Sequence, residues 1–264
     1  MVRPNPFRAP DPTEVPLSSA PLVRVIAQLR FAPIASLGQL GFIAPFQEAI
    51  RPSYPILRPQ QAASLVVAEG GAPALVQSTS WRFGDKTGKW FVSLAPDFVA
   101  LETTSYTSRA DFFVRLGAVL EAFTNVTEPG LVGYDRFGVR YVNRVQKPQF
   151  DDLSRLVHPE VLGIAGPLAD DLGFSICESS FNVEDASLRA RWGVLPAGAT
   201  TDPTTIEPLS ESSWILDLDM FVERQAEFDG ASVVSRGRLF AEAVYKLFRW
   251  CVTDEFLRAY GGHQ

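Results

Sequence analysis

Histidine and cysteine are scarce in this sequence, with two of each among 264 residues. A structural zinc site needs about four ligands, and His158, His263, Cys177 and Cys251 lack metal-site spacing. We therefore expect no metal and no cofactor. His158, which precedes a proline, is expected to be structural or exposed, and His263, the penultimate residue, to be frayed. Both cysteines lie in apolar contexts, so we expect buried free thiols in a reducing cytoplasm.

Long apolar runs are missing as well. No stretch of about 18 consecutive apolar residues exists, which excludes a transmembrane helix. The first six residues contain no apolar core of a secretory signal. We therefore expect a cytoplasmic protein with no membrane partner. The hydrophobic content of 46% and the aromatic content of 11% are enough for a large core and exclude a wholly disordered chain.

Lysine is rare, and positive charge is not in excess. Four of the 24 basic residues are lysines and the other 20 are arginines, while the net charge is −6. This balance disfavours nonspecific binding to nucleic acid, which makes nucleic acid an unlikely partner. The abundant arginine has two interpretations. One is the base composition of a GC-rich genome, and the other is bidentate recognition of anions, which arginine performs better than lysine.

The pattern of apolar residues and turns predicts an order of secondary-structure elements that occurs twice along the chain. The first series is a strand, a helix, four strands and a helix, at 22–31, 37–51, 63–69, 74–83, 89–95, 98–104 and after Ser108. The second series has strands at 130–145, 174–183, 188–195 and 214–222, and helices at 151–157 and 233–260. A polar loop at 196–213 is long enough to be mobile or functional.

This repetition predicts three segments and an α+β fold. Residues 1–21, with six prolines, form an extended arm that is either disordered or laid across the body. Residues 22–129 and 130–264 form tandem duplicated strand-helix-strands-helix units. Their edges pair into one curved antiparallel sheet with helices on one face and a concave free face. The element order resembles the saddle folds of TATA-binding-protein-like and helix-grip domains.

The most distinctive stretch runs from Tyr134 to Arg144. On a strand, Arg136 and Arg140 project from one face about 13 Å apart, at roughly 3.3 Å per residue. The alternate residues Phe137, Val139 and Tyr141 face the core. The two guanidinium groups either grip an anionic partner or pair with cross-strand acids, for which the candidates are Asp217, Asp219 and Glu102.

Other residues complete the candidate site. Asp217 and Asp219 are two apart on a strand and share a face, which is either a solvated surface or a site. The strand tryptophans belong to the core or line an aromatic binding surface. The candidate binding residues are Arg30, Arg136, Arg140, Asn143, Trp214, Asp217 and Asp219. No catalytic residue is predicted, because the G-x-S-x-G, P-loop, H-E-x-x-H and G-x-G-x-x-G motifs are missing.

Four blocks of this chain are distinctive: Pro21-Leu22-Val23, the run Leu29–Pro33, the block from Arg136 to Asn143, and Phe248-Arg249-Trp250 before Thr253-Asp254. Together they resemble a sporadically distributed bacterial protein family. The resemblance spans about residues 21 to 258 and is strongest in the R-F-G-V-R-Y-V-N block. It implies a bacterial cytoplasmic protein of patchy occurrence. It implies no activity and transfers no catalytic residue.

The expected function is that of a non-enzymatic binding or regulatory protein. Its ligand is a partner protein or an anionic small molecule, recognised by the arginine-bearing strand. Two alternatives stay open. The first is a component of a phage-defence or toxin–antitoxin type system, which would neutralise a partner by acidic mimicry. The second is a hydrolase-like enzyme that uses carboxylates in the concave cleft, recognisable by acids with raised pKa values.

Overall fold

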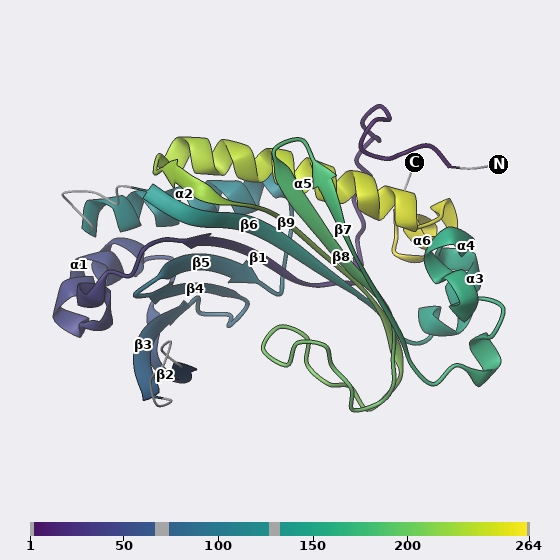
Figure 1. The fold of residues 1–264 in the computed structure, drawn as a ribbon, viewed down its shortest axis with the longest axis horizontal. Coiled ribbons are helices and arrows are strands. Elements are labelled where there is room, and N and C mark those ends of the chain that lie inside the picture. Colours follow the sequence, from purple (N-terminus) through teal and green to yellow (C-terminus); the bar gives the residue numbers. More distant parts are fainter. Residues whose placement is uncertain (1–2, 67–73, 127–132, 263–264) are drawn as a thin grey trace. The chain divides into compact units, whose positions relative to one another are not determined.

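The structure, a computed structural model, describes residues 3–66, 74–126 and 133–262. The strand residues predicted at 67–69 and 130–132, and His263, lie outside the described residues. The described elements confirm the α+β class, with a nine-stranded antiparallel sheet in the order β2-β3-β4-β5-β1-β6-β9-β8-β7 (Figure 1). No helix among these residues is long and apolar enough to cross a membrane.

The elements follow the predicted order closely. The strands are β1 (Leu22–Arg30), β2 (Ile56–Val66), β3 (Ala74–Gly84), β4 (Trp90–Ala95), β5 (Phe98–Thr103), β6 (Gly133–Val145), β7 (Ser175–Val183), β8 (Ala186–Leu195) and β9 (Ser213–Glu227). The helices are α1 (Leu40–Ile50), α2 (Arg109–Val126), α3 (Leu153–Leu156), α4 (Pro159–Leu162), α5 (Gly230–Cys251) and α6 (Asp254–Ala259). The sequence strand-helix-strands-helix thus occurs twice, and a common origin of the two series by duplication stays a prediction.

The chain forms two compact units. Unit 1 contains residues 1–25, 139–221 and 239–264, and unit 2 contains residues 26–138 and 222–238. The boundaries between them fall inside β1, β6, β9 and α5. Each unit therefore draws on both predicted repeats.

Helix α2 of unit 2 forms where its local sequence signals predict. The Asp111 backbone N–H donates to Ser108 Oγ at 3.1 Å, as expected for an N-terminal cap. The predicted apolar stripe of this helix is buried, with exposed fractions of 0 to 3% at Phe112, Leu116, Val119, Leu120 and Phe123. Helix α1 packs against α2 and adds Ile43 and Phe46 to the same core.

Strand β2 starts earlier than predicted. It pairs with β3 from Ile56 opposite Gly84 onward, although Pro59 lies within it. Proline has no N–H to donate, so it is tolerated in strands at an edge. Strand β2 is the first strand in the order of the sheet, which explains why Pro59 does not end it.

The prediction of one continuous C-terminal helix at 233–260 is wrong. Helix α5 ends at Cys251, and α6 begins at Asp254. Between them Thr253 is extended, and its Oγ1 accepts the Phe256 N–H at 3.2 Å, which caps α6. Val252 instead forms a bridge with Val157. The predicted apolar face is nevertheless buried, at Phe240, Val244, Leu247, Phe248, Cys251 and Val252.

The two cysteines differ in exposure. Both are free, and Cys251 is buried as predicted. The prediction for Cys177 is wrong, because this residue is exposed. It lies on β7, the last strand in the order of the sheet, and its neighbour Ile176 points to the opposite face and packs into a buried cluster. As an edge strand, β7 has a neighbouring strand on one side only, and Cys177 is therefore exposed to solvent.

Candidate functional site

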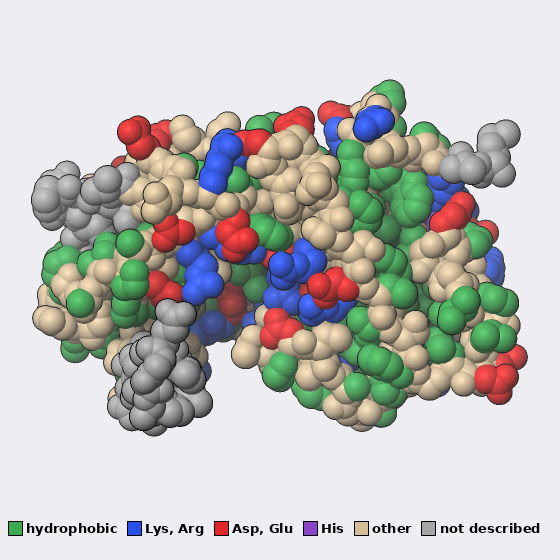
Figure 2. Space-filling view, viewed as in Figure 1, with side chains coloured by type: hydrophobic (Ala, Val, Ile, Leu, Met, Phe, Trp, Pro, Cys, Tyr) green, Lys and Arg blue, Asp and Glu red, His purple; other side chains and the backbone are tan. Residues whose placement is uncertain are grey.

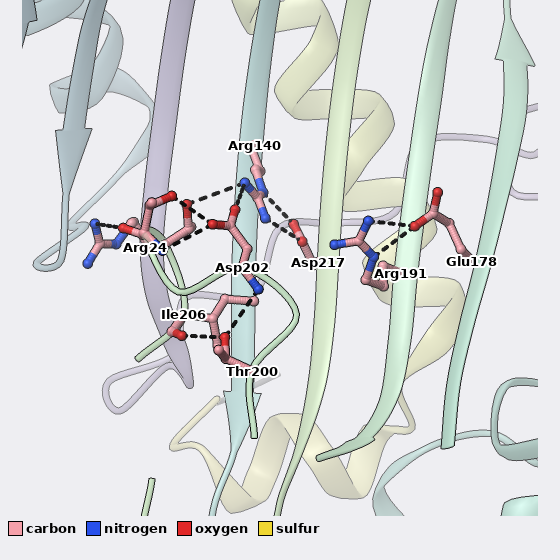
Figure 3. Close-up of polar contacts among 10 residues, drawn as sticks. Arg24, Arg140, Glu178, Arg191, Thr200, Asp202, Ile206 and Asp217 are labelled. Atoms are coloured by element: carbon pink, nitrogen blue, oxygen red, sulfur yellow. Dashed lines mark hydrogen bonds and ion pairs between the residues drawn. The ribbon is translucent and has the colours of Figure 1, made fainter. Parts of the chain in front are cut away.

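One face of the sheet in unit 1 carries a row of alternating charges across four strands (Figure 3). Glu178 of β7 is the register partner of Arg191 of β8, and the Arg191 Nη2 group lies 2.6 Å from Glu178 Oε2. Arg191 is in turn the register partner of Asp217 of β9. Arg140 of β6 donates to both oxygens of Asp217, through Nε at 2.8 Å and Nη2 at 2.7 Å. The four side chains therefore alternate in sign from strand to strand.

The row continues into the loop between β8 and β9. Arg140 Nη1 donates to Asp202 Oδ2 at 2.8 Å. The other oxygen of Asp202 accepts the Thr204 N–H at 3.2 Å and the Thr204 hydroxyl at 2.7 Å. Burial alone would raise the pKa of Asp202, but hydrogen bonds from Thr204, Arg140 and Thr205 outweigh it and hold the pKa well below its usual value. Asp202 is therefore a fixed negative charge.

Arg140 is the centre of this network. Burial opposes its charge, but the hydrogen bonds and charges of Asp217 and then Asp202 more than compensate and raise its pKa. Only 6% of the Asp217 side chain is exposed, against 21% for Arg140 and 23% for Asp202. Such a largely desolvated group of charges is rigid, because moving any one member leaves the others uncompensated.

The loop at 196–212 is ordered by an apolar anchor as well as by charge. Ile206 is 1% exposed and packs in a cluster with Val142, Leu195 and Ile215 of the sheet. Its backbone N–H donates to the Asp202 carbonyl at 2.7 Å, which closes a turn between the two residues. Figure 3 shows the loop in front of the strands and helix behind them, so these contacts lie on the face away from that helix.

Two further arginines hold the backbone of this loop. Arg24 Nη1 donates to the Thr204 carbonyl at 3.4 Å. Arg144, which is 4% exposed, donates to the Glu207 carbonyl and, through Nε at 2.9 Å, to Ser213 Oγ. Both acceptors of Arg144 are neutral, and burial lowers its pKa. Together with Arg140, these residues fasten the loop to the sheet.

An open cleft of about 340 Å³ lies on this face. Its lining is Arg140, Arg189, Arg191, Thr201, Asp202, Pro203, Asp217 and Asp219. Arg189 is exposed, and its guanidinium carbon lies 5.4 Å from the centre of the Phe221 ring. Figure 2 shows basic and acidic side chains interspersed on the visible face of the molecule. The cleft is therefore polar and lined by charges of both signs.

The structure brings three of the candidate residues together. Arg140, Asp217 and Asp219 all line the cleft, and the predicted pairing of Arg140 with a cross-strand acid is observed with Asp217. The exposed Arg30 and the mostly buried Arg136 both belong to unit 2. Arg30 pairs with Asp97 at 3.0 Å, and Arg136 lies 4.0 Å from Glu223.

Asn143 and Trp214 lie in the interior. Asn143 is 6% exposed and its Nδ2 donates to the Leu216 carbonyl at 3.3 Å. Trp214 is 1% exposed. Neither residue lines the cleft, and both fit a role in packing the sheet.

Arg189, Arg191 and Asp202 were not among the candidates predicted from the sequence. The alternation Leu188-Arg189-Ala190-Arg191 on a strand is a signal that points both arginines to one face. Asp202 has no comparable signal, because it lies in a loop with no periodic pattern.

The described residues contain no group of three His, Cys, Asp or Glu side chains that could hold a metal ion. His158 forms the cap position before α4 and does not line the cleft. Burial and the charge of Arg3 lower its pKa.

The sequence matches no protein-family model and no curated protein. The resemblance to a sporadically distributed bacterial family stays a prediction.

Proposed function

We propose that this chain is a non-enzymatic binding protein of a bacterial cytoplasm, and that the cleft of unit 1 binds a small molecule with an anionic group. The observation that carries the proposal is the convergence of three guanidinium groups, from Arg140, Arg189 and Arg191, on one open cleft. Guanidinium groups suit carboxylates and phosphates because their N–H groups form two parallel hydrogen bonds.

The three arginines have different parts in this proposal. Arg140 forms an ion pair with Asp217, and Arg191 forms one with Glu178. These two arginines therefore shape the cleft and set the electrostatic potential inside it. Arg189 is the exposed arginine of the three, and its contact with Phe221 limits its freedom. An anion that approaches from solvent meets Arg189 first. Preorganised donors of this kind lower the cost of ordering on binding.

The size and polarity of the cleft favour a small polar ligand. Binding sites for small molecules commonly measure about 300–1,000 Å³, and this cleft measures about 340 Å³. Asp219 and the hydroxyl of Thr201 also line the cleft and can accept hydrogen bonds from hydroxyl or amino groups of the same ligand. A ligand that combines an anionic group with hydrogen-bond donors would satisfy both signs of charge.

The charge state of Asp202 supports binding over acid catalysis. A general acid needs a pKa near the working pH, which requires a raised carboxyl pKa. Asp202 has a lowered pKa because its oxygens are hydrogen-bonded to Thr204, Arg140 and Thr205. It stays ionised and acts as an acceptor and as a partner of Arg140.

The test uses charge reversal at Arg189, because reversal at Arg140 would leave Asp217 and Asp202 uncompensated and unfold the site. The probes are inorganic phosphate and a set of small hydroxy-carboxylates, measured by calorimetry at low salt. We expect saturable binding of at least one probe, and at least tenfold weaker binding in Arg189→Glu. Arg58→Glu is the matched control, since Arg58 is also an exposed strand arginine but lies in unit 2. Equal binding by both variants, or no binding of any probe, would refute the proposal.

A further inference from the structure

The proline-rich arm at residues 3–19 contacts the C-terminal helices of unit 1. The indole Nε1 of Trp250 donates to the Pro4 carbonyl at 3.0 Å, and the Arg3 guanidinium lies 5.4 Å from the centre of the same indole. Near the other end of the arm, the Ser19 N–H donates to the Tyr260 carbonyl at 3.1 Å. The arm is therefore held at both ends.

Two neighbouring residues of α5 bind the middle of the arm. The Tyr245 hydroxyl accepts the Val15 N–H at 2.9 Å and donates to the Thr13 carbonyl at 3.3 Å. Lys246 Nζ lies 2.5 Å from Asp11 Oδ1. Tyr245 thus satisfies both a donor and an acceptor of the arm backbone, and Lys246 adds recognition of an acidic side chain. Lys246 and Trp250 are four residues apart and so lie on one helix face.

Two glycines after α6, Gly261 and Gly262, leave room for the arm. Gly261 has a φ of +76°, and a Cβ at this position would lie 2.0 Å from Ser18 Oγ. A Cβ at Gly262 would lie 2.9 Å from both Leu17 Cδ2 and Val15 Cγ1. At residue 261 the positive φ favours glycine, and at residue 262 the Leu257 carbonyl oxygen, also 2.9 Å from a Cβ, adds to the limit on size.

These contacts are those by which folded proteins recognise proline-rich segments. From residue 10 to residue 16 the arm has neither helix nor strand structure, and this stretch contains Pro10, Pro12 and Pro16. Such a segment leaves its backbone carbonyls unpaired, and aromatic side chains with an N–H or O–H group pair with them. Tyr245 makes such a bond to Thr13 within this stretch, and Trp250 makes one to Pro4, which lies before a turn at residues 6–8.

We propose that the surface formed by Tyr245, Lys246 and Trp250, here called the arm groove, is a recognition site for a proline-rich segment with an acidic residue from a partner protein. The arm occupies this site in cis and competes with the partner. Asp11 is 73% exposed at its side chain, so its bond with Lys246 exchanges readily. A tethered competitor acts at an effective concentration in the millimolar range, which keeps the groove closed to weak ligands.

The proposal is tested on the full chain with a weakened arm. An arm variant replaces Pro4, Pro10, Pro12 and Pro16 by alanine and carries Asp11→Lys, which sets a positive charge against Lys246. The probe is a fluorescent peptide with the native sequence of residues 3–17, followed by anisotropy. We expect the peptide to bind the arm variant at least tenfold more tightly than it binds the unaltered chain.

Two further variants show whether the groove is the binding site. Trp250→Leu in the arm variant should abolish binding, since it removes the indole donor. If Trp250→Leu fails to fold, a second experiment replaces it, in which the charges of the Lys246–Asp11 pair are exchanged. Lys246→Glu in the arm variant should weaken binding of the native peptide by about threefold to fivefold, and a peptide with Asp11→Lys should restore it. Failure of the peptide to bind the folded arm variant, or the same affinity in all groove variants, would overturn the proposal. Both outcomes leave the cleft of the proposed function untouched.

Discussion

Arg140 and Asp217 are 77 residues apart in the chain and form a two-point ion pair, with Nε–Oδ1 and Nη2–Oδ2 distances of 2.8 and 2.7 Å. The pair links β6 to β9 through side chains as well as through the sheet. Both residues line the cleft, and Asp202 attaches the β8–β9 loop to the same guanidinium. Arg140 therefore connects two strands and the loop at one point of the site.

Breaking the pair should destabilise the protein strongly. In Asp217→Asn, the guanidinium of Arg140 keeps Asp202 but loses its more deeply buried counter-charge, and we expect a loss of about 1.5–3 kcal/mol in the free energy of unfolding. The measurement is urea denaturation followed by circular dichroism. Because Arg140 also pairs with Asp202, the rescue must remove all three charges. The triple variant Arg140→Met, Asp217→Leu and Asp202→Asn should recover at least half of that loss.

The matched control is an ion pair of similar length at the surface. Arg51 and Glu48 are 2.9 Å apart, and their side chains are 60% and 64% exposed. Solvent screens such pairs, so Arg51→Gln should cost less than about 1 kcal/mol. A similar cost for Arg51→Gln and Asp217→Asn would contradict a special role for the buried pair.

Acid should weaken the attachment of the loop. The pKa of Asp202 is lower in the folded protein than the value of about 3.9 for a free aspartate. Its contribution to stability is therefore complete above about pH 4 and is lost as the pH falls toward the folded pKa. We expect Asp202→Asn to melt below the unaltered protein at pH 7, and the difference between their melting temperatures to shrink below about pH 4. A difference that stays constant down to pH 2.5 would show that the charge of Asp202 contributes nothing.

Helix α5 should tolerate no side chain at Gly237. A Cβ there would lie 2.5 Å from Phe113 Cε1 and 3.1 Å from Phe137 Cζ, and both rings are at most 1% exposed. Since these rings have no room to move, Gly237→Ala should cost about 1–3 kcal/mol. Gly41→Ala in α1 is the control, because no atom lies within 4 Å of its Cβ. That variant should stabilise the helix by about 0.5–1 kcal/mol. Thermal denaturation of both variants is the measurement. Destabilisation of the same size in Gly237→Ala and Gly41→Ala would contradict the prediction.

The two thiols should react at very different rates. Cys177 is exposed, whereas burial raises the pKa of Cys251 to about 12 and shields it from reagents. An aromatic disulfide reagent should modify one thiol per chain in the native protein and two in guanidinium chloride. Cys177→Ser should show no fast reaction. Rapid modification of two thiols under native conditions would mean that the core around Cys251 opens readily.

The features that follow a regular period were predictable from the sequence. The two-residue period of a strand places Arg140 on one face and its core neighbours on the other, and it gives Asp217 and Asp219 a common face. The structure agrees, because Arg140, Asp217 and Asp219 line one cleft. The start of α2 was equally predictable, since the cap formed by Ser108 is a local signal.

Contacts that depend on the path of the chain could not be predicted in this way. Asp202 reaches Arg140 across 62 residues from a loop that has no period. The break at Thr253 is hidden because Phe256 and Leu257 continue the apolar pattern of α5 and are themselves buried. The position of the arm depends on Gly261, whose small size matters only once the arm lies against it.

The chain crosses from one compact unit to the other within β1, β6, β9 and α5. A gene fragment that encoded only one unit would end in the middle of these elements, and it would have to be assembled from separate stretches of coding sequence. Recombination between genes therefore has no single cut that transfers one unit intact. The two halves of this architecture must be inherited together, and a deletion of β6 or β9 removes strand residues from both.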